Sequence, residues 1–373
     1  MKLLSLYKEN LLFYIMTKKR KSDYDSDDDY DDYDDYDDYD DYDDYDDSDD
    51  HPIKVPKVNK ELIIINKEVN TIRDLIDLGK LYDSSKDYNI DLKQLHNLVP
   101  SLTELDNMIG MDHVKCDMVD HILFYIQKLD DRNNDMMHTI IQGSPGVGKT
   151  ELAKIISKIY LAMGILKNKN FIKATRSTLI AQYLGQTAPK TQKVIDSAIG
   201  GVLFIDEVYS LGNSDKKDMY AKECIDTINE NLTEKKTDFI CIIAGYKEDI
   251  EQCFLSWNKG LDRRFPVRFN IESYSGEELF LIFKKKVYDL DWKLDETITD
   301  AFFIDNHKYF KNFGGDMEIL FAMCKRMHSR RIFATNGKSK IITMDDLTKA
   351  FTKYKEKNNS PTIDDEVWKN MFL

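Results

Sequence analysis

The sequence predicts an α/β fold in which helices cover both faces of a parallel β-sheet, followed by a small all-helical domain. Between residues 101 and 273, short apolar segments of strand length alternate with amphipathic helical patterns, as in a parallel sheet buried on both faces. A glycine-rich run, GSPGVGKT, joins one of these strands to the next helix. After Phe269 no further strand is predicted, and helical patterns continue toward the C-terminus.

Four segments are predicted along the chain. Residues 1–57 are expected to be disordered, 58–100 to form a helical extension, 101–273 to form the α/β domain and 274–373 to form the all-helical domain. In the α/β domain, strands are predicted at 139–142, 171–174, 202–205 and 239–243, and helices at 114–129, 149–163, 188–199 and 221–232. Helices of the C-terminal domain are predicted at 276–290, 297–310, 316–332 and 344–355.

The N-terminal segment is strongly acidic, whereas the rest of the chain is mildly basic. Residues 22–50 contain nineteen Asp and no Lys, Arg or Glu, with Asp-Asp-Tyr repeats from Tyr30 to Tyr45. The whole chain carries a formal charge of −14, so the remainder without this segment carries +5. Charge repulsion and the scarcity of aliphatic residues predict a disordered acidic tail. We interpret it either as a solubilising spacer or as a segment that binds basic partners, or the basic body of its own chain, through charge and tyrosine stacking.

The composition argues against a secreted, membrane-anchored or zinc-binding protein. The five Cys form no CxxC pair, and the seven His have no metal-ligand spacing. The apolar run at 11–15 is too short for a spanning helix. We therefore expect an intracellular, cytoplasmic protein without membrane association. The basic run MTKKRK at 16–21 leaves nuclear import and a start at Met16 open. The residue usage fits a protein of a protist or of a large DNA virus, and a viral protein would act in its host cell.

The run GSPGVGKT matches the pattern GxxxxGK[ST] and lies where a phosphate site requires it, between a strand and a helix. Its glycines allow a tight turn that directs N–H groups at an anion, and the helix N-terminus adds a favourable dipole. Lys149 is expected to reach the β- and γ-phosphates of ATP, and the Thr150 hydroxyl to bind Mg²⁺. The predicted nucleotide-binding residues of this loop are Gly143, Ser144, Pro145, Gly146, Val147, Gly148, Lys149 and Thr150.

A pair of carboxylates follows the apolar strand at 202–205. Asp206 lies at the carboxyl end of this strand, where open parallel sheets bind ligands. Asp206 is therefore expected to bind Mg²⁺ together with Thr150, and Glu207 to polarise the attacking water. Capping of the next segment is the alternative role for both carboxylates. The 57 residues from Lys149 to Asp206 leave room for a helix, a strand and a helix, which favours a hydrolase over a small-molecule kinase.

Four further runs carry a family resemblance: YLGQTAPKT (183–191), GGVLFIDEVYSL (200–211), AGY (244–246) and NKGLDRRF (258–265). With the glycine-rich run, they resemble the CbbX/CfxQ group of AAA+ ATPases, which includes stage V sporulation protein K. The resemblance covers about residues 102–354. It implies a P-loop NTPase (AAA+) fold with an all-helical lid domain, and a homo-oligomeric ring, usually a hexamer, that binds ATP between neighbouring subunits.

The resemblance also assigns roles to residues at the boundary between subunits and at the adenine base of ATP. Arg264 would be the arginine finger that stabilises charge on the neighbour's γ-phosphate. Without the resemblance, Arg263 and Arg264 are interpreted as a basic surface pair. Ile109 and Gly110 would receive the adenine, with simple packing as the alternative.

Tyr183, Leu184 and Gly185 lie where AAA+ proteins carry an aromatic central-pore loop that grips a polypeptide. An exposed aromatic residue beside a glycine gives a mobile grip that tolerates many sequences. The alternative is an aromatic residue buried at the end of a helix.

Two positions depart from the family pattern. The run GGDM at 314–317 has Met317 where family members often have a nucleotide-sensing lid arginine. Arg326, Arg330 and Arg331 lie further along the same predicted helix and are candidates to compensate, against the alternative of a solvated basic face. Tyr246 occupies a position at which many AAA+ proteins have a polar sensing residue.

Together these features predict an ATPase that uses ATP and Mg²⁺, forms a ring, and remodels an unidentified protein partner in the manner of a chaperone. Two other functions stay open. A nucleic-acid motor or loader is compatible with the mildly basic body, but no helix-turn-helix or zinc module is found, and the acidic tail would repel phosphates. The other is a nucleotide-gated interaction protein that recruits basic partners through its acidic tail.

Overall fold

The computed structural model describes residues 60–131, 135–183, 185–213, 215–333 and 339–359, all within the unit Asn59–Leu373. The acidic tail, its expected disorder, the basic run and the alternative start lie outside the described residues. The same holds for Leu184 of the expected pore loop.

The α/β domain is built on a five-stranded parallel sheet with the order β4-β5-β6-β3-β7. Its strands are β3 (Thr139–Gly143), β4 (Phe171–Ala174), β5 (Val202–Ile205), β6 (Ile240–Gly245) and β7 (Val267–Ile271). The first four confirm the predicted strands. The sequence analysis missed β7 because VRFNI alternates apolar and polar residues, as suits its place at the edge of the sheet.

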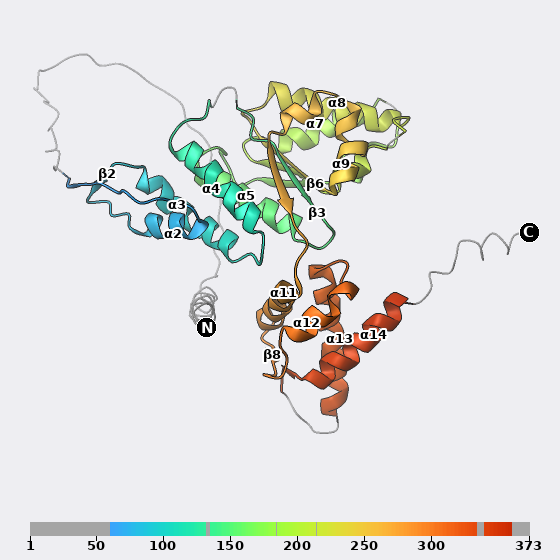
Figure 1. Cartoon of the computed structure of the whole chain (residues 1–373). Coiled ribbons are helices and arrows are strands. Elements are labelled where there is room, and N and C mark those ends of the chain that lie inside the picture. The colour runs from blue at the N-terminus through green and yellow to red at the C-terminus, as the bar shows by residue number, and fades with distance from the viewer. Residues whose placement is uncertain (1–59, 132–134, 184, 214, 334–338, 360–373) are drawn as a thin grey trace, which may run out of the picture. The chain divides into compact units, whose positions relative to one another are not determined.

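Helices cover both faces of this sheet (Figure 1), as predicted. Alternate residues of β5 pack into two separate cores: Val202 and Phe204 into the first, and Leu203 and Ile205 into the second. Successive strand residues point to opposite faces, so a strand buried on both sides needs a continuous apolar run. The first core is shared with α4 (Asp112–Ile126) and α5 (Lys149–Ala162), and the second with α7 (Thr187–Ser197), α8 (Met219–Glu234) and α9 (Lys247–Cys253).

The N-terminal extension is a hairpin of α2 (Ile72–Lys80) and α3 (Leu92–Asp106), with a short parallel pair of β1 (Leu62–Ile63) and β2 (Asp87–Tyr88). Thr71 begins α2 with a capping box shared with Asp74. The two helices approach closely at Gly79, where a Cβ would lie 2.8 Å from Leu95 O. Because α3 continues through Pro100 to Asp106, the boundary predicted at residue 100 falls inside a helix.

The C-terminal lid domain consists of α11 (Gly276–Asp289), α12 (Ala301–Asn306), the 3₁₀ turn η3 (His307–Tyr309), α13 (Gly314–Ile332) and α14 (Met344–Asn359). Its core is aromatic: the rings of Phe283, Phe303, Phe310 and Phe351 follow one another with centroids 5.2, 6.2 and 5.6 Å apart. The domain also contains one short parallel pair, β8 (Lys293–Leu294) with β9 (Ile341–Ile342).

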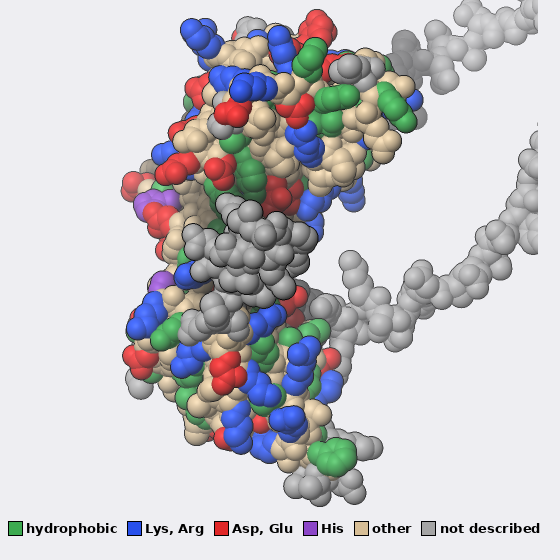
Figure 2. All heavy atoms as spheres, turned by 90° about the vertical axis from the view of Figure 1, so that its right-hand side faces the viewer, with side chains coloured by type: hydrophobic (Ala, Val, Ile, Leu, Met, Phe, Trp, Pro, Cys, Tyr) green, Lys and Arg blue, Asp and Glu red, His purple; other side chains and the backbone are tan. Residues whose placement is uncertain are grey.

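Charged side chains of both signs appear on the face drawn in Figure 2, and Lys and Arg gather over its lower part with acidic side chains among them.

The functional edge of the sheet lies where three strands end. β3 leads into the glycine-rich run, β5 into Asp206 and β6 into Tyr246. Because β6 pairs with both β3 and β5, Tyr246 follows the strand between the glycine-rich run and the carboxylates.

Candidate functional site

The phosphate loop, residues 143–150, connects β3 to α5, and two of its glycines have left-handed backbone. The angle φ is +73° at Gly146 and +93° at Gly148, values that residues with a side chain rarely adopt. Gly148 is the N-cap residue of α5. The first four N–H groups of a helix have no partner within it, so this turn presents free donors at the loop.

Lys149 places its ammonium group against the loop. Its Nζ donates to Gly143 O and Ser144 O, each at 2.8 Å, and lies 5.0 Å from the centre of the Tyr246 ring. The pKa of Lys149 is lowered, chiefly because burial penalises the charged ammonium, while the Asp206 and Glu207 carboxylates act in the opposite direction. Lys149 therefore lies near both the loop and the acidic residues.

Asp206 receives two donors at one carboxylate oxygen. Thr150 Oγ1 donates to Asp206 Oδ2 at 3.2 Å, and Lys173 Nζ lies 2.7 Å from the same oxygen. The structure thus brings together the two residues expected to bind Mg²⁺ and adds a cation that the sequence analysis missed. Lys173 lies on β4, opposite Phe204 of β5. Predicting this contact of Lys173 would have required knowing that β4 and β5 are neighbours in the sheet.

Glu207 is exposed, and its backbone is left-handed with φ 51° and ψ 47°, a strained region for a residue with a side chain. It precedes the 3₁₀ turn η1 (Val208–Leu211), in which Tyr209 stacks on Tyr246 with ring centres 5.4 Å apart. Burial raises the pKa of the Tyr209 phenol, and the Glu207 carboxylate and Tyr246 raise it further. The phenol accordingly keeps its proton beside Glu207.

The turn before α4 carries Ile109 and Gly110, both partly buried. Gly110 has φ +64°, and a Cβ there would lie 3.2 Å from Cε1 of the Tyr274 ring. Tyr274 lies between β7 and α11, and the sequence analysis did not identify it. Gly110 therefore lies beside the Tyr274 ring, and a Cβ on it would come closer still to the Glu278 carboxylate of α11.

Two methionines link this turn to the phosphate loop. A Cβ on Gly148 would lie 3.5 Å from the methyl carbon of Met111 and 3.6 Å from that of Met108. Met108 directly precedes and Met111 directly follows the two residues predicted to receive the adenine. Together they form apolar surroundings next to the start of α5.

Arg264 is bound within its own subunit. In the short helix α10 (Leu261–Arg264), its Nη1 donates to Gly260 O at 2.6 Å and its Nε to Thr233 Oγ1 at 3.0 Å. The neighbouring Arg263 is exposed. To contact the phosphate of another subunit, Arg264 would have to give up these two hydrogen bonds. Its role as an arginine finger therefore stays a prediction.

Tyr183 is 67% exposed, so the alternative of a buried aromatic residue does not apply. Gly185 has φ +75°, and a Cβ there would meet no atom within 4 Å. The side chain of Tyr183 is therefore accessible to a partner, while gripping of a polypeptide by this segment stays a prediction.

The lid has no arginine at the expected sensing position. Met317 is fully buried in the lid core. The three arginines considered as substitutes, Arg326, Arg330 and Arg331, are all exposed. Arg331 donates through Nε to both oxygens of Asp346, and its Nη2 lies 2.9 Å from Oδ2. Arg331 therefore joins α13 to the buried Asp346 of α14, while part of its own side chain faces solvent.

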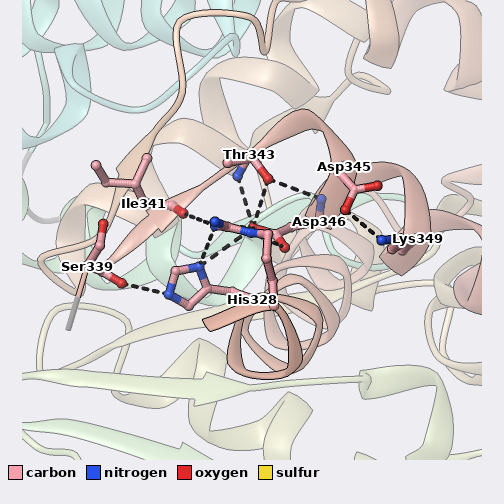
Figure 3. Close-up of polar contacts among 8 residues, drawn as sticks. His328, Ser339, Ile341, Thr343, Asp345, Asp346 and Lys349 are labelled. Carbon is pink, nitrogen blue, oxygen red and sulfur yellow. Dashed lines mark hydrogen bonds and ion pairs between the residues drawn. The ribbon is translucent and has the colours of Figure 1, made fainter. Parts of the chain in front are cut away.

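Asp346 is the centre of this buried network (Figure 3). It is 1% exposed and accepts hydrogen bonds from the N–H and the hydroxyl of Thr343. His328 lies 3.6 Å from the same carboxylate and contacts Ser339 O through Nε2 at 2.6 Å. A buried charge with this many partners is a structural element of the lid.

No group of three or more His, Cys, Asp or Glu side chains arranged to hold a metal ion occurs in the part of the chain that the structure describes. In nucleotide sites, Mg²⁺ takes only one or two protein oxygens in addition to phosphates and water. Over the same described ranges, none of the helices combines the length and the apolar character needed to cross a lipid bilayer.

Comparison with known proteins agrees with this arrangement. Residues 139–272 match the ATPase family associated with various cellular activities (AAA). The chain is 44% identical over 301 residues to a cfxQ-like protein of Acanthamoeba polyphaga mimivirus, and the match covers 78% of this chain and 74% of that protein. It is 35% identical over 199 residues to stage V sporulation protein K of Bacillus subtilis, covering 52% and 61% of the two chains. It is 33% identical over 210 residues to the chloroplastic ribulose bisphosphate carboxylase/oxygenase activase of Cyanidioschyzon merolae, covering 55% and 71%. With its phosphate loop, its paired carboxylates and these likenesses, the chain belongs to the CfxQ-like family of AAA ATPases.

Proposed function

We propose that the protein hydrolyses ATP within a ring of identical subunits and uses the free energy to remodel a protein partner. The observation that carries the proposal is the meeting of Thr150 and Asp206 at the carboxyl edge of the sheet, with Lys149 on the same loop. Glu207 follows Asp206 directly and is accessible to water. This is the set of groups that ATP hydrolysis requires.

The residues fit ATP with Mg²⁺. The left-handed turns at Gly146 and Gly148 leave N–H groups for phosphate oxygens. The Thr150 hydroxyl and the Asp206 carboxylate are oxygen ligands of the kind that Mg²⁺ prefers, and they already lie within hydrogen-bond distance of each other. Bound Mg²⁺ would neutralise and orient the phosphates.

Glu207 is the residue proposed to activate water. Its carboxylate oxygen would accept a hydrogen bond, and then a proton, from a water molecule. Tyr209, which keeps its proton, would donate to the same carboxylate and limit its rotation. Lys149 would balance the negative charge of the phosphates, and Arg264 of a neighbouring subunit would add a second cation.

The exposure of Tyr183 supports action on a polypeptide, because an accessible aromatic ring can pack on many kinds of side chain. The name of the activase relative describes action on another enzyme. The alternative of a nucleic-acid motor needs a continuous basic surface, and the Lys and Arg side chains over the lower part of the face in Figure 2 are interrupted by acidic ones. The partner proposed for this chain is an extended protein segment.

The hydrolysis step is tested with Glu207→Gln, and Glu251→Gln, an exposed carboxylate of α9, serves as the control. We expect ATP turnover to fall at least about 100-fold in the first variant and to stay unchanged in the second. Calorimetry should find ATP still bound to both. Turnover by Glu207→Gln at the rate of the unchanged protein would refute the role of this carboxylate.

The remodelling step is tested by adding a permanently unfolded polypeptide or, separately, double-stranded DNA to the ATPase assay. We expect the polypeptide to stimulate turnover and Tyr183→Ala to lose this stimulation while keeping its basal rate. Stimulation by DNA alone, declining with salt, would instead support the nucleic-acid motor.

A further inference from the structure

Two consecutive carbonyl groups of the phosphate loop accept hydrogen bonds from residues that follow the sheet. The N–H of Gly314, the first residue of α13, donates to Gly146 O at 3.1 Å. The hydroxyl of Tyr274 donates to Val147 O at 2.8 Å. We infer that Gly314 and Tyr274 are positioning residues that aim the phosphate-binding N–H groups of the loop. The inference rests on the proposed ATP site and deepens it.

The geometry of the peptide bond links these contacts to phosphate binding. In a planar trans peptide, the carbonyl of one residue and the N–H of the next point in opposite directions. Fixing Gly146 O therefore fixes the N–H of Val147, and fixing Val147 O fixes the N–H of Gly148. Because the carbonyls face Gly314 and Tyr274, both N–H groups face the other side of the loop, where phosphate oxygens would bind.

Both donors are held firmly. Tyr274 is 6% exposed, and burial together with Glu278 raises its pKa to about 12, so its hydroxyl remains a donor. Its own carbonyl is contacted by His307 Nε2 at 2.7 Å. Phe313, next to Gly314, has the strained angles φ 43° and ψ −108°. Packing maintains this strain, since the buried Phe313 ring meets the Tyr274 ring edge-on at 6.0 Å.

The contact between the phosphate loop and the start of α13 leaves no room for a side chain on Gly146 or on Gly314. A Cβ on Gly146 would overlap Asn312 O, and a Cβ on Gly314 would lie 2.8 Å from Gly146 O. By contrast, a Cβ on Gly315 would have its nearest neighbour 3.9 Å away. The chain thus offers two adjacent glycines at the start of one helix, only the first of which is pressed against the loop.

These contacts give the lid a route to the nucleotide that does not use an arginine. The residue at the expected sensing position, Met317, lies in the lid core and carries no charge. An arginine would contact the γ-phosphate and would distinguish ATP from ADP. A backbone contact to the loop does not reach the γ-phosphate, so we expect it to affect ATP and ADP equally.

The experiment compares Gly314→Ala and Tyr274→Phe with the control Gly315→Ala in the full chain. Affinities for ATP, ADP and inorganic tripolyphosphate are measured by calorimetry or competition, the last probe having no base for Tyr274 to contact. We expect a loss of affinity of about three- to tenfold for all three ligands, as for a hydrogen bond of typical strength. The expected KM for ATP rises by the same factor, with kcat within twofold of the unchanged protein.

Affinities of Gly314→Ala equal to those of Gly315→Ala, or a loss confined to ATP, would overturn the inference. Thermal unfolding identifies a variant that fails to fold, and Tyr274→Phe, which keeps the ring, then decides alone. If the unchanged protein binds none of the three ligands, the proposed ATP site itself is wrong, and this outcome differs from failure of the positioning contacts.

Discussion

Lys173 and Thr150 contact the same oxygen of Asp206, at 2.7 and 3.2 Å respectively. Thr150 is neutral and can stay in place when Asp206 binds Mg²⁺. Lys173 is a cation and would lie next to a divalent ion of the same sign. Lys173 is therefore expected to oppose metal binding at Asp206 while attracting the phosphates.

Substitution of Lys173 by Met should make Mg²⁺ binding tighter. The Lys173 side chain is about half exposed, so solvent screening limits its effect, and the Mg²⁺ concentration for half-maximal ATP binding should fall about two- to fivefold. Binding of ATP without Mg²⁺ should weaken. Titrations with Lys169→Met, an exposed lysine before β4, give the control. An unchanged Mg²⁺ dependence would show that Lys173 does not influence the metal.

The buried Asp346 network predicts a large difference between two adjacent aspartates. Asp346→Asn leaves the partly exposed Arg331 facing an uncharged partner and removes a buried acceptor of several hydrogen bonds, so it should lower the free energy of unfolding by about 2 kcal/mol. Asp345→Asn removes an exposed pair with Lys349 and should cost less than about 1 kcal/mol. Chemical denaturation of both variants measures the difference. Equal losses would contradict a structural role for the network.

His138 should make stability depend on pH. The ring is fully buried between Leu232 O, 3.2 Å from Nε2, and the N–H of Cys241, which donates to Nδ1 at 3.0 Å. Burial lowers its pKa to about 4 from the ordinary 6.5, and the Leu232 carbonyl opposes this only in part. Between these values the unfolded chain binds a proton that the folded chain does not.

The free energy of unfolding should therefore fall as pH is lowered from about 6.5 to about 4, by about 3 kcal/mol in total for this residue. Denaturation at a series of pH values should give this slope, and His138→Gln should lack its contribution. The exposed His113 provides the control: His113→Gln should keep the slope. If the pH dependence of the free energy of unfolding is unchanged in His138→Gln, other groups are responsible for it.

Arg264 can be tested as a residue that acts across a subunit boundary. Arg264→Ala and Lys149→Ala should each abolish most ATP turnover on its own. Mixed rings contain some sites with an intact Lys149 from one subunit and an intact Arg264 from the next, so mixing the two inactive proteins should restore part of the activity. Arg263→Ala serves as the control and should remain active. If mixing restores no activity although mixed rings form, Arg264 acts within its own subunit.

Most of the sheet could be predicted from the sequence because its inner strands are buried on both faces. VLFI of β5 and ICIIAG of β6 are continuous apolar runs and give a strong signal. The edge strand β7 alternates apolar and polar residues and gives none. The two-residue pairs β1 with β2 and β8 with β9 are too short to have a periodic pattern.

The site could be predicted only where its residues are close in sequence or belong to a motif. The phosphate loop and the Asp206–Glu207 pair are of this kind. Lys173, Tyr274 and Gly314 come from three separate parts of the chain, and each contacts the site through a pairing or a packing contact that no local pattern encodes. The absence of a lid arginine could be recognised from the sequence, but the contact of Gly314 with the phosphate loop could not.

Strand β6 pairs with the strand of the phosphate loop on one side and with the strand of Asp206 on the other. Tyr246, directly after β6, accordingly touches both halves of the site, with its ring 5.0 Å from the Lys149 ammonium and stacked on Tyr209. A library randomised at this single codon would vary the environment of both halves at once. Position 246 is thus an economical starting point for engineering variants with a different turnover rate or nucleotide preference.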